Sequence, residues 1–130
     1  MADQADVRRI ALSLPETGEE DGRFAFFVLN RGKRKAFAWV WMERTQPKRP
    51  RVARPDVIAV RVDGQDDKEA LLALDAEKFF TEPHYHGFPA VLVRLPAIDD
   101  DELEELITDG WRCQAPRALV RTFDGSGGVS

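Results

Sequence analysis

The chain has 130 residues, 43% of them hydrophobic and 32% charged, with a formal net charge of −4. A chain of this size fits one folded domain and buries enough surface to need no metal or disulfide staple. Its single cysteine, Cys113, excludes an intramolecular disulfide and a cysteine-based zinc site. The first residues lack the features of a signal peptide, and no apolar run approaches the roughly 20 residues of a membrane span. We therefore expect a cytoplasmic protein that does not enter a membrane.

Positive charge is concentrated in one part of the chain. Residues 31–61 contain ten lysine and arginine residues against two acids, Glu43 and Asp56. They carry a surplus of eight positive charges and leave −12 for the rest of the chain, whose total is −4. Such a division is typical of proteins with an anionic partner. It is equally typical of a solvated sheet edge, where lysine and arginine discourage edge-to-edge aggregation.

The first expected element is an amphipathic helix. Its apolar residues recur at i, i+3, i+4 and i+7, namely Val7, Ile10, Ala11 and Leu14. Asp3 or Asp6 can cap the start of this helix, and Pro15 ends it. Residues 16–22 then form an acidic, turn-rich connection.

Two strands are predicted next, over residues 24–30 and 35–42, joined by a hairpin turn at residues 30–33. Both strands carry apolar side chains on both faces. We therefore expect their sheet to be covered on both sides, by helices, by a second subunit or by a ligand. Strict alternation along the second strand places three aromatic residues on one face: Phe37, Trp39 and Trp41.

The middle of the chain predicts a loop, a strand and a helix. Residues 43–55 combine three prolines with several arginines, which favours a stiff, extended loop. A strand over residues 57–62 follows. Asp66, with Glu69 as its capping-box partner, is expected to begin the next helix.

The last part of the chain completes the expected fold. The segment around His84 and residues 91–95 predict two more strands, and four acids at residues 99–102 begin a helix. A last short element reaches Phe123. The predicted class is α+β, with the element order α-β-β-β-α-β-β-α around a single antiparallel-rich sheet flanked by helices. One domain covers residues 1–123, and residues 124–130 form a flexible C-terminal tail.

Three motifs in this order carry a resemblance to a known family. They are Ala11-Leu12-Ser13-Leu14-Pro15-Glu16-Thr17, the stretch from Phe79 to Leu95, and Glu102 to Leu106 followed by Gly110-Trp111-Arg112 and Ala115-Pro116-Arg117. Together they resemble the MmcQ/YjbR family. The resemblance implies a secretion-chaperone-like α+β fold, and members are commonly labelled DNA-binding. The chain departs from the family pattern twice, because no Trp-Gly-x-Pro sequence follows Gly22 and His86 replaces an expected Asp or Asn.

The two histidines form a candidate site of chemistry. Glu82, His84 and His86 alternate, so a strand would place all three on one face, where they could ligate a metal. Pro83 and Gly87 interrupt such a strand, and a surface turn is the expectation. His84 could also act as a general base, but no serine or cysteine stands in a nucleophile motif. We therefore favour a non-enzymatic protein without catalytic residues, metal or cofactor.

A binding module is the expected function, with DNA as its leading partner class. Phosphate contacts require only exposed cations on a suitable segment. The candidate residues are Arg31, Lys33, Arg34, Lys35, Arg44, Lys48, Arg49, Arg51 and Arg54.

The alternative is a protein-interaction or small-ligand-binding domain that uses the aromatic sheet face and the turn at His84 and Tyr85. Its candidate ligand-binding residues are Trp39, His84 and Tyr85. The aromatic stripe also has the form of a stacking platform for single-stranded nucleic acid. Core packing is the more common role of such a stripe. A homodimer is compatible with each of these functions.

Overall fold

The computed structural model describes residues 2–43, 48 and 50–127. Its helices are α1 (Gln4–Ser13), α2 (Gln65–Leu74), α3 (Asp100–Gln114) and α4 (Arg117–Gly127). Its strands are β1 (Thr17–Glu19), β2 (Ala25–Asn30), β3 (Lys33–Glu43), β4 (Val52–Arg61), β5 (Phe79–Phe80) and β6 (Ala90–Arg94). Two short 3-10 helices, η1 (Pro83–Tyr85) and η2 (Leu95–Ala97), flank β6.

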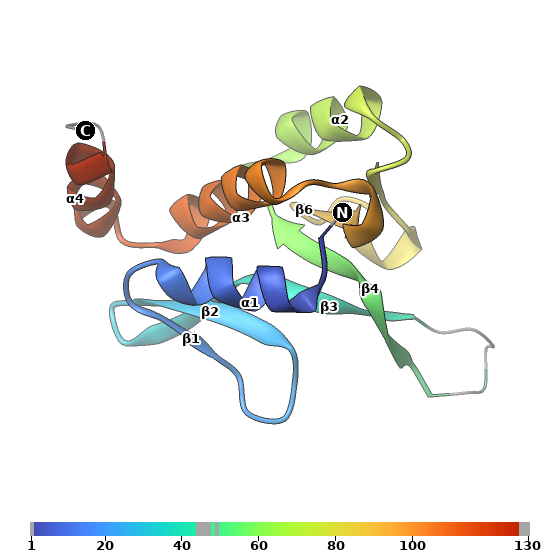
Figure 1. The fold of residues 1–130 in the computed structure, drawn as a ribbon, viewed down its shortest axis with the longest axis horizontal. Coiled ribbons are helices and arrows are strands. Elements are labelled where there is room, and N and C mark those ends of the chain that lie inside the picture. The colour runs from blue at the N-terminus through green and yellow to red at the C-terminus, as the bar shows by residue number, and fades with distance from the viewer. Residues whose placement is uncertain (1, 44–47, 49, 128–130) are drawn as a thin grey trace.

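The six strands form one sheet in the order β1-β2-β3-β4-β6-β5, and every neighbouring pair is antiparallel (Figure 1). This arrangement confirms the predicted α+β class. The hairpin turn between β2 and β3 is also confirmed. Arg31 and Gly32 both have positive φ, 54° and 78°, as a two-residue type I′ turn requires.

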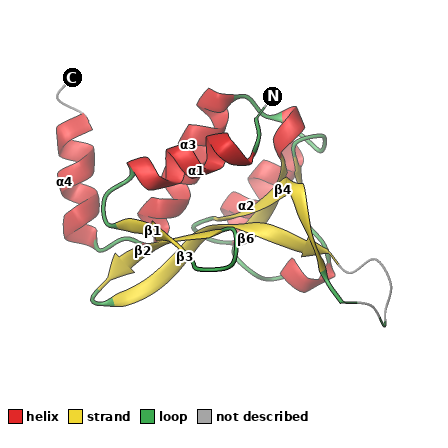
Figure 2. Cartoon of the chain, turned by 60° about the horizontal axis from the view of Figure 1, so that its bottom comes forward, coloured by secondary structure: helices red, strands yellow, loops and turns green. Residues whose placement is uncertain are grey.

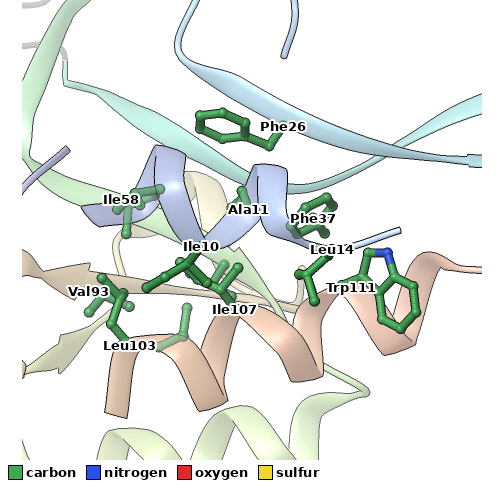
Figure 3. Packing of buried hydrophobic residues seen from close by; sticks show 14 of the residues in the cluster. Ile10, Ala11, Leu14, Phe26, Phe37, Ile58, Val93, Leu103, Ile107 and Trp111 are labelled. Atoms are coloured by element: carbon green, nitrogen blue, oxygen red, sulfur yellow. The ribbon is translucent and has the colours of Figure 1, made fainter. Parts of the chain in front are cut away.

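Helices α1 and α3 cover one face of the sheet (Figure 2). α1 begins with a capping box, in which Asp3 and Asp6 each accept a hydrogen bond from the other's backbone N–H. Asp99 caps α3 by accepting a hydrogen bond from the N–H of Glu102. Apolar stripes of both helices meet the strands in one core (Figure 3), which includes Ile10, Ala11, Phe26, Phe37, Ile58, Leu103, Ile107 and Trp111.

Helix α3 approaches the sheet closely at Gly110. A Cβ atom at this position would lie 3.0 Å from the carbonyl oxygen of Arg61 and 3.2 Å from that of Phe37. Both neighbours are backbone atoms of central strands, so neither can shift without a large cost in free energy. The absence of a side chain at Gly110 therefore sets the distance between helix and sheet.

A bulge between β2 and β3 changes the direction of the aromatic side chains. Phe26 pairs with Ala38 while Phe27 pairs with Ala36, so Phe37 is an extra residue on β3. Phe37 and Ala38 consequently both enter the helix-side core, and Trp39 lies on the opposite face. The prediction that Phe37 shares a face with Trp39 was wrong, because it assumed unbroken alternation.

A second irregularity lies between β3 and β4. Val40 pairs with Ile58, but Trp41 pairs with Arg54, which leaves residues 55–57 unmatched on β4. Pro55 falls in this gap, where no ladder hydrogen bond is required of its nitrogen. The predicted loop over residues 43–55 is thus shorter than expected, because strand pairing continues on both of its sides.

Three further local predictions were wrong. The residues around His84 form η1 instead of a strand. The capping residue of α2 is Gly64, with no side-chain cap, so Asp66 does not open that helix. The connection over residues 16–22 contains the short strand β1, which pairs with β2.

Helix α4 lies against the end of α3. The ring of Phe123 lies 4.9 Å from that of Trp111, measured between centroids, and Arg112 forms an ion pair with Asp124 at 2.8 Å. Residues 124–127, assigned above to the tail, continue this helix. No helix in the described part of the chain is long and apolar enough to cross a bilayer.

Candidate functional site: the open face of the sheet

The face of the sheet that is turned away from α1 and α3 carries a second, smaller apolar cluster. Strand pairing places Trp39, Ala59, Leu92 and Phe80 in one row across four strands. Val57, Trp41 and Tyr85 complete the cluster. We call these seven residues the open face. Trp39 and Trp41 are only partly buried, although the indole nitrogen of Trp41 is covered and has no hydrogen-bond partner among the described residues.

Residues 81–89, which include η1, fold over one side of the open face. The indole N–H of Trp39 donates a hydrogen bond of 2.9 Å to the hydroxyl of Tyr85. The rings of Trp39 and Tyr85 both meet the ring of Phe88 edge to face. The sequence proposed Trp39 and Tyr85 as ligand-binding residues, and the fold brings them together. The side chain of the third candidate, His84, is outside the described part of the structure.

A buried lysine holds this segment in place. Lys68 on α2 is 3% exposed, and its ammonium group donates hydrogen bonds to the carbonyl oxygens of Tyr85 and of Phe88, the latter at 2.9 Å. Burial lowers the pKa of Lys68. The lysine therefore positions Tyr85 against Trp39 from the helix side of the molecule.

Lys68 was not recognised from the sequence, although a signal exists. Leu71 and Leu72 follow it at i+3 and i+4, and both pack against the main core. A lysine at this point of an apolar helical stripe must either reach solvent or find acceptors. The acceptors lie about 20 residues further along the chain, where no local pattern indicates them.

Replacing Lys68 with methionine tests its role in stability. The variant keeps an unbranched side chain but leaves two carbonyl oxygens without their donor, so the free energy of unfolding should fall by about 1–3 kcal/mol. The pKa of Lys68 is lowered in the folded state from the ordinary lysine value of 10.5. Between these two values the unfolded state binds more protons than the folded state, so the wild type gains stability as the pH rises. The deficit of the variant should therefore grow as the pH rises from 7 toward 10.5.

Lys78→Met supplies the matched control for this experiment. The carboxylate of Glu102, 2.5 Å from the Lys78 ammonium, raises the pKa of Lys78. Its stabilising contribution is present below the ordinary lysine pKa and is lost as the pH rises through the raised value, so the deficit of Lys78→Met should shrink at alkaline pH. Urea unfolding of the three proteins from pH 7 to above pH 10.5 measures both trends. Parallel curves for the two variants would contradict the assignment.

Two hollows flank the tryptophans of the open face. One, of about 350 Å³, is lined by Trp39, Met42, Arg51, Tyr85 and Phe88. The other, of about 400 Å³, is lined by residues that include Trp41, Phe80, Arg54 and Arg94. The guanidinium of Arg94 lies 4.0 Å from the centroid of the Phe80 ring. Cationic groups thus lie beside the aromatic side chains of the open face.

The structure divides the predicted nucleic-acid-binding residues into two groups. Arg31, Lys33, Arg34 and Lys35 lie at the turn between β2 and β3, whereas Lys48, Arg51 and Arg54 lie at or beyond the other end of β3. Arg44 and Arg49 are outside the described residues. A strand of the length of β3 spans about 33 Å. The cations therefore form two clusters, one at each end of this strand, and not one continuous patch.

Several of these cations already have partners. Arg34 pairs with Glu20 at 3.3 Å and lies over the ring of Phe27. Arg54 forms ion pairs with Glu43 and Asp56. Among the described residues, no ion pair or hydrogen bond occupies the side chains of Arg31, Lys33, Lys35 and Lys48. These four remain available to an anionic partner.

The metal hypothesis for Glu82, His84 and His86 loses its geometric basis. η1 replaces the strand on which the three side chains would alternate. In the described part of the chain, no three histidine, cysteine, aspartate or glutamate side chains are grouped as a metal ion would need.

The fold of this chain is similar to one solved structure, and its sequence is similar to those of mycobacterial proteins. Protein DR2400 of Deinococcus radiodurans, with a domain of the family model DUF419, has a crystal structure that superposes with a TM-score of 0.62. The match covers 85% of this chain and 77% of DR2400 at 21% identity, so it supports the fold alone. The uncharacterised proteins Rv2570 of Mycobacterium tuberculosis and Mb2600 of Mycobacterium bovis are each 40% identical over 140 residues. Those matches cover 98% of this chain and 100% of each relative.

A family model described as YjbR matches residues 12–113. This range contains all six strands, β1 to β6, and it includes Trp39, Trp41, Lys68 and Tyr85. On the extent of this match and the identity to the mycobacterial proteins, the chain belongs to the YjbR family.

Proposed function

We propose that the protein binds single-stranded nucleic acid along the open face of its sheet. The observation that carries the proposal is the position of Trp39 and Trp41, partly buried side by side on the face without α1 and α3. Partial burial fixes the orientation of each indole and leaves part of its ring for contact. Stacking of a base on such a ring contributes about 1–3 kcal/mol in sequence-tolerant single-strand binding, beside the attraction of cations for phosphates.

The distribution of charge favours a single strand over a duplex. The unpaired cations Arg31 and Lys48 lie beyond the two ends of β3, with the tryptophans between them. Lys33 and Lys35 pair with Asn30 and Val28, and so lie on the helix side of the sheet. An extended strand that runs along β3 could place phosphates at both clusters and bases on the rings. A duplex would need one continuous cationic surface of matching shape. The acids that begin α2 and α3, including Asp66, Asp100 and Asp101, belong to the helix side and would repel a strand there.

Fluorescence anisotropy with a labelled single-stranded DNA and the matching duplex tests the proposal. We expect micromolar binding of the single strand at low salt, weaker binding of the duplex, and a decline of affinity with salt concentration. Arg31→Ala combined with Lys48→Ala should flatten the salt dependence, because two phosphate contacts are removed. No binding of the single strand at low salt would contradict the proposal.

The hollow beside Trp39 and Tyr85 favours small-ligand binding as a second candidate function. The hydrogen bond between these residues fixes one wall of the hollow. Binding of small planar compounds in the absence of any oligonucleotide binding would favour this candidate.

A further inference from the structure

A cleft of about 560 Å³ lies on the helix side of the sheet, where β4 ends and α2 begins. It is independent of the open face, because its apolar wall includes Leu71 and Leu106, which pack against the helix-side core. Its volume is in the range typical of small-molecule sites. The lining residues are Arg61, Val62, Asp63, Asp67, Ala70, Leu71, Leu106, Asp109, Arg112 and Cys113.

The charged groups of the cleft are not equally available to a ligand. Arg112 donates a hydrogen bond of 2.7 Å to Asp109 and also pairs with Asp124, so these three charges are mutually satisfied. The guanidinium of Arg61 lies over the ring of Phe88, 5.7 Å from its centroid.

Asp63 and Asp67 are different, because within the described residues neither carboxylate has an ion pair or a hydrogen bond. Both are exposed at the rim of the cleft.

The pKa of the Cys113 thiol reflects the charges that surround it in the cleft. The pKa of Cys113 is raised, first by burial and then by the charge of Asp63, with smaller contributions from Asp109 and Asp67. Only Arg61 acts in the opposite direction. Among the described lining residues, the two unpaired carboxylates thus outnumber the one guanidinium without a carboxylate partner, that of Arg61, whose Nε is buried without a hydrogen bond. This balance favours a cationic over an anionic ligand.

We propose that this cleft binds a small organic cation, with its ammonium group between Asp63 and Asp67 and its apolar body against Leu71 and Leu106. Two unpaired carboxylates beside an apolar wall complement a primary amine attached to a hydrocarbon or aromatic group. Neither feature alone would select this chemistry, because the carboxylates attract any cation and the wall accepts any apolar group.

Cys113 is the only cysteine of the chain, so its reaction rate measures the charge preference of the cleft directly. We would compare two methanethiosulfonate reagents of similar size, one carrying ethylammonium and the other ethylsulfonate. The ratio of the cationic to the anionic rate on the folded protein should exceed the ratio of the same reagents on free 2-mercaptoethanol by at least about fivefold. In Asp63→Asn combined with Asp67→Asn, this ratio should approach that of the free thiol. Asp66→Asn is the matched control, because Asp66 is exposed in the same turn but does not line the cleft.

Direct ligand binding completes the test. Hexylamine should slow the modification of Cys113 and should bind in a calorimetric or NMR titration, while hexanoate should do neither. The double asparagine variant should lose at least about tenfold in hexylamine affinity, and Asp66→Asn should retain it. Equal behaviour of hexylamine and hexanoate, or an unchanged amine affinity in the double variant, would overturn the proposal. Both readouts are independent of oligonucleotide binding.

Discussion

Trp111→Ala is expected to lower the free energy of unfolding by about 3–5 kcal/mol. The indole is 0% exposed, and its N–H donates a hydrogen bond of 3.0 Å to the carbonyl oxygen of Pro15. Its ring also packs against Phe123 of α4. One side chain thus joins α3 to the end of the α1 segment and to α4, and its removal leaves a cavity together with an unpaired carbonyl.

Chemical denaturation of matched variants separates these contributions. Trp111→Phe keeps most of the apolar volume but loses the hydrogen bond, so its stability should lie between that of the wild type and that of Trp111→Ala. Leu74→Ala serves as the control for a general effect of removing an apolar side chain, because Leu74 is 71% exposed and should change stability little. A loss below about 1 kcal/mol for Trp111→Ala would contradict the assigned role.

Trp39→Ala combined with Trp41→Ala is expected to give the largest loss of single-strand binding. Stacking of one base on an aromatic ring contributes about 1–3 kcal/mol, so each single variant should weaken binding by about 5- to 150-fold. The double variant should bring the affinity close to the limit set by the cations alone. Anisotropy titrations at one fixed salt concentration measure these losses.

Phenylalanine variants provide the control for this prediction. Trp39→Phe and Trp41→Phe retain a ring for stacking and should keep most of the affinity. Circular dichroism and urea unfolding must show that each variant remains folded, since both indoles also contact neighbours such as Tyr85 and Phe80. An affinity that is the same for the alanine variants and the wild type would place nucleic-acid binding elsewhere.

The helices and the fold class could be predicted because their signals are local. The apolar spacing of residues 7–14 gives α1, and the acids at its start form the observed capping box. The sheet face on which each aromatic side chain of β3 lies was harder to predict. A bulge adds one residue beside Phe37, and no pattern in one strand reveals a residue that has no partner on the next. Alternation therefore placed Trp39 and Trp41 together correctly but assigned Phe37 to the wrong face.

Only part of the candidate site could be predicted from the sequence. The cations of residues 31–54 were evident from composition, but their separation by the length of β3 follows from the extended hairpin that pairing produces. The contact between Trp39 and Tyr85 joins residues 46 positions apart in the sequence. It depends on the hydrogen bonds of Lys68, whose acceptors are backbone atoms. Contacts of this kind arise from tertiary structure and are not indicated by any periodic pattern in the sequence.

The most direct test of the open-face account is an NMR titration that follows the indole N–H signals. The chain has three tryptophans, and each contributes one such signal. On addition of a single-stranded DNA of about ten nucleotides, the signals of Trp39 and Trp41 should shift. The signal of Trp111 should stay in place, since that indole is buried beneath the helices and bonded to Pro15. Unchanged signals for Trp39 and Trp41 in the presence of bound DNA would contradict the account.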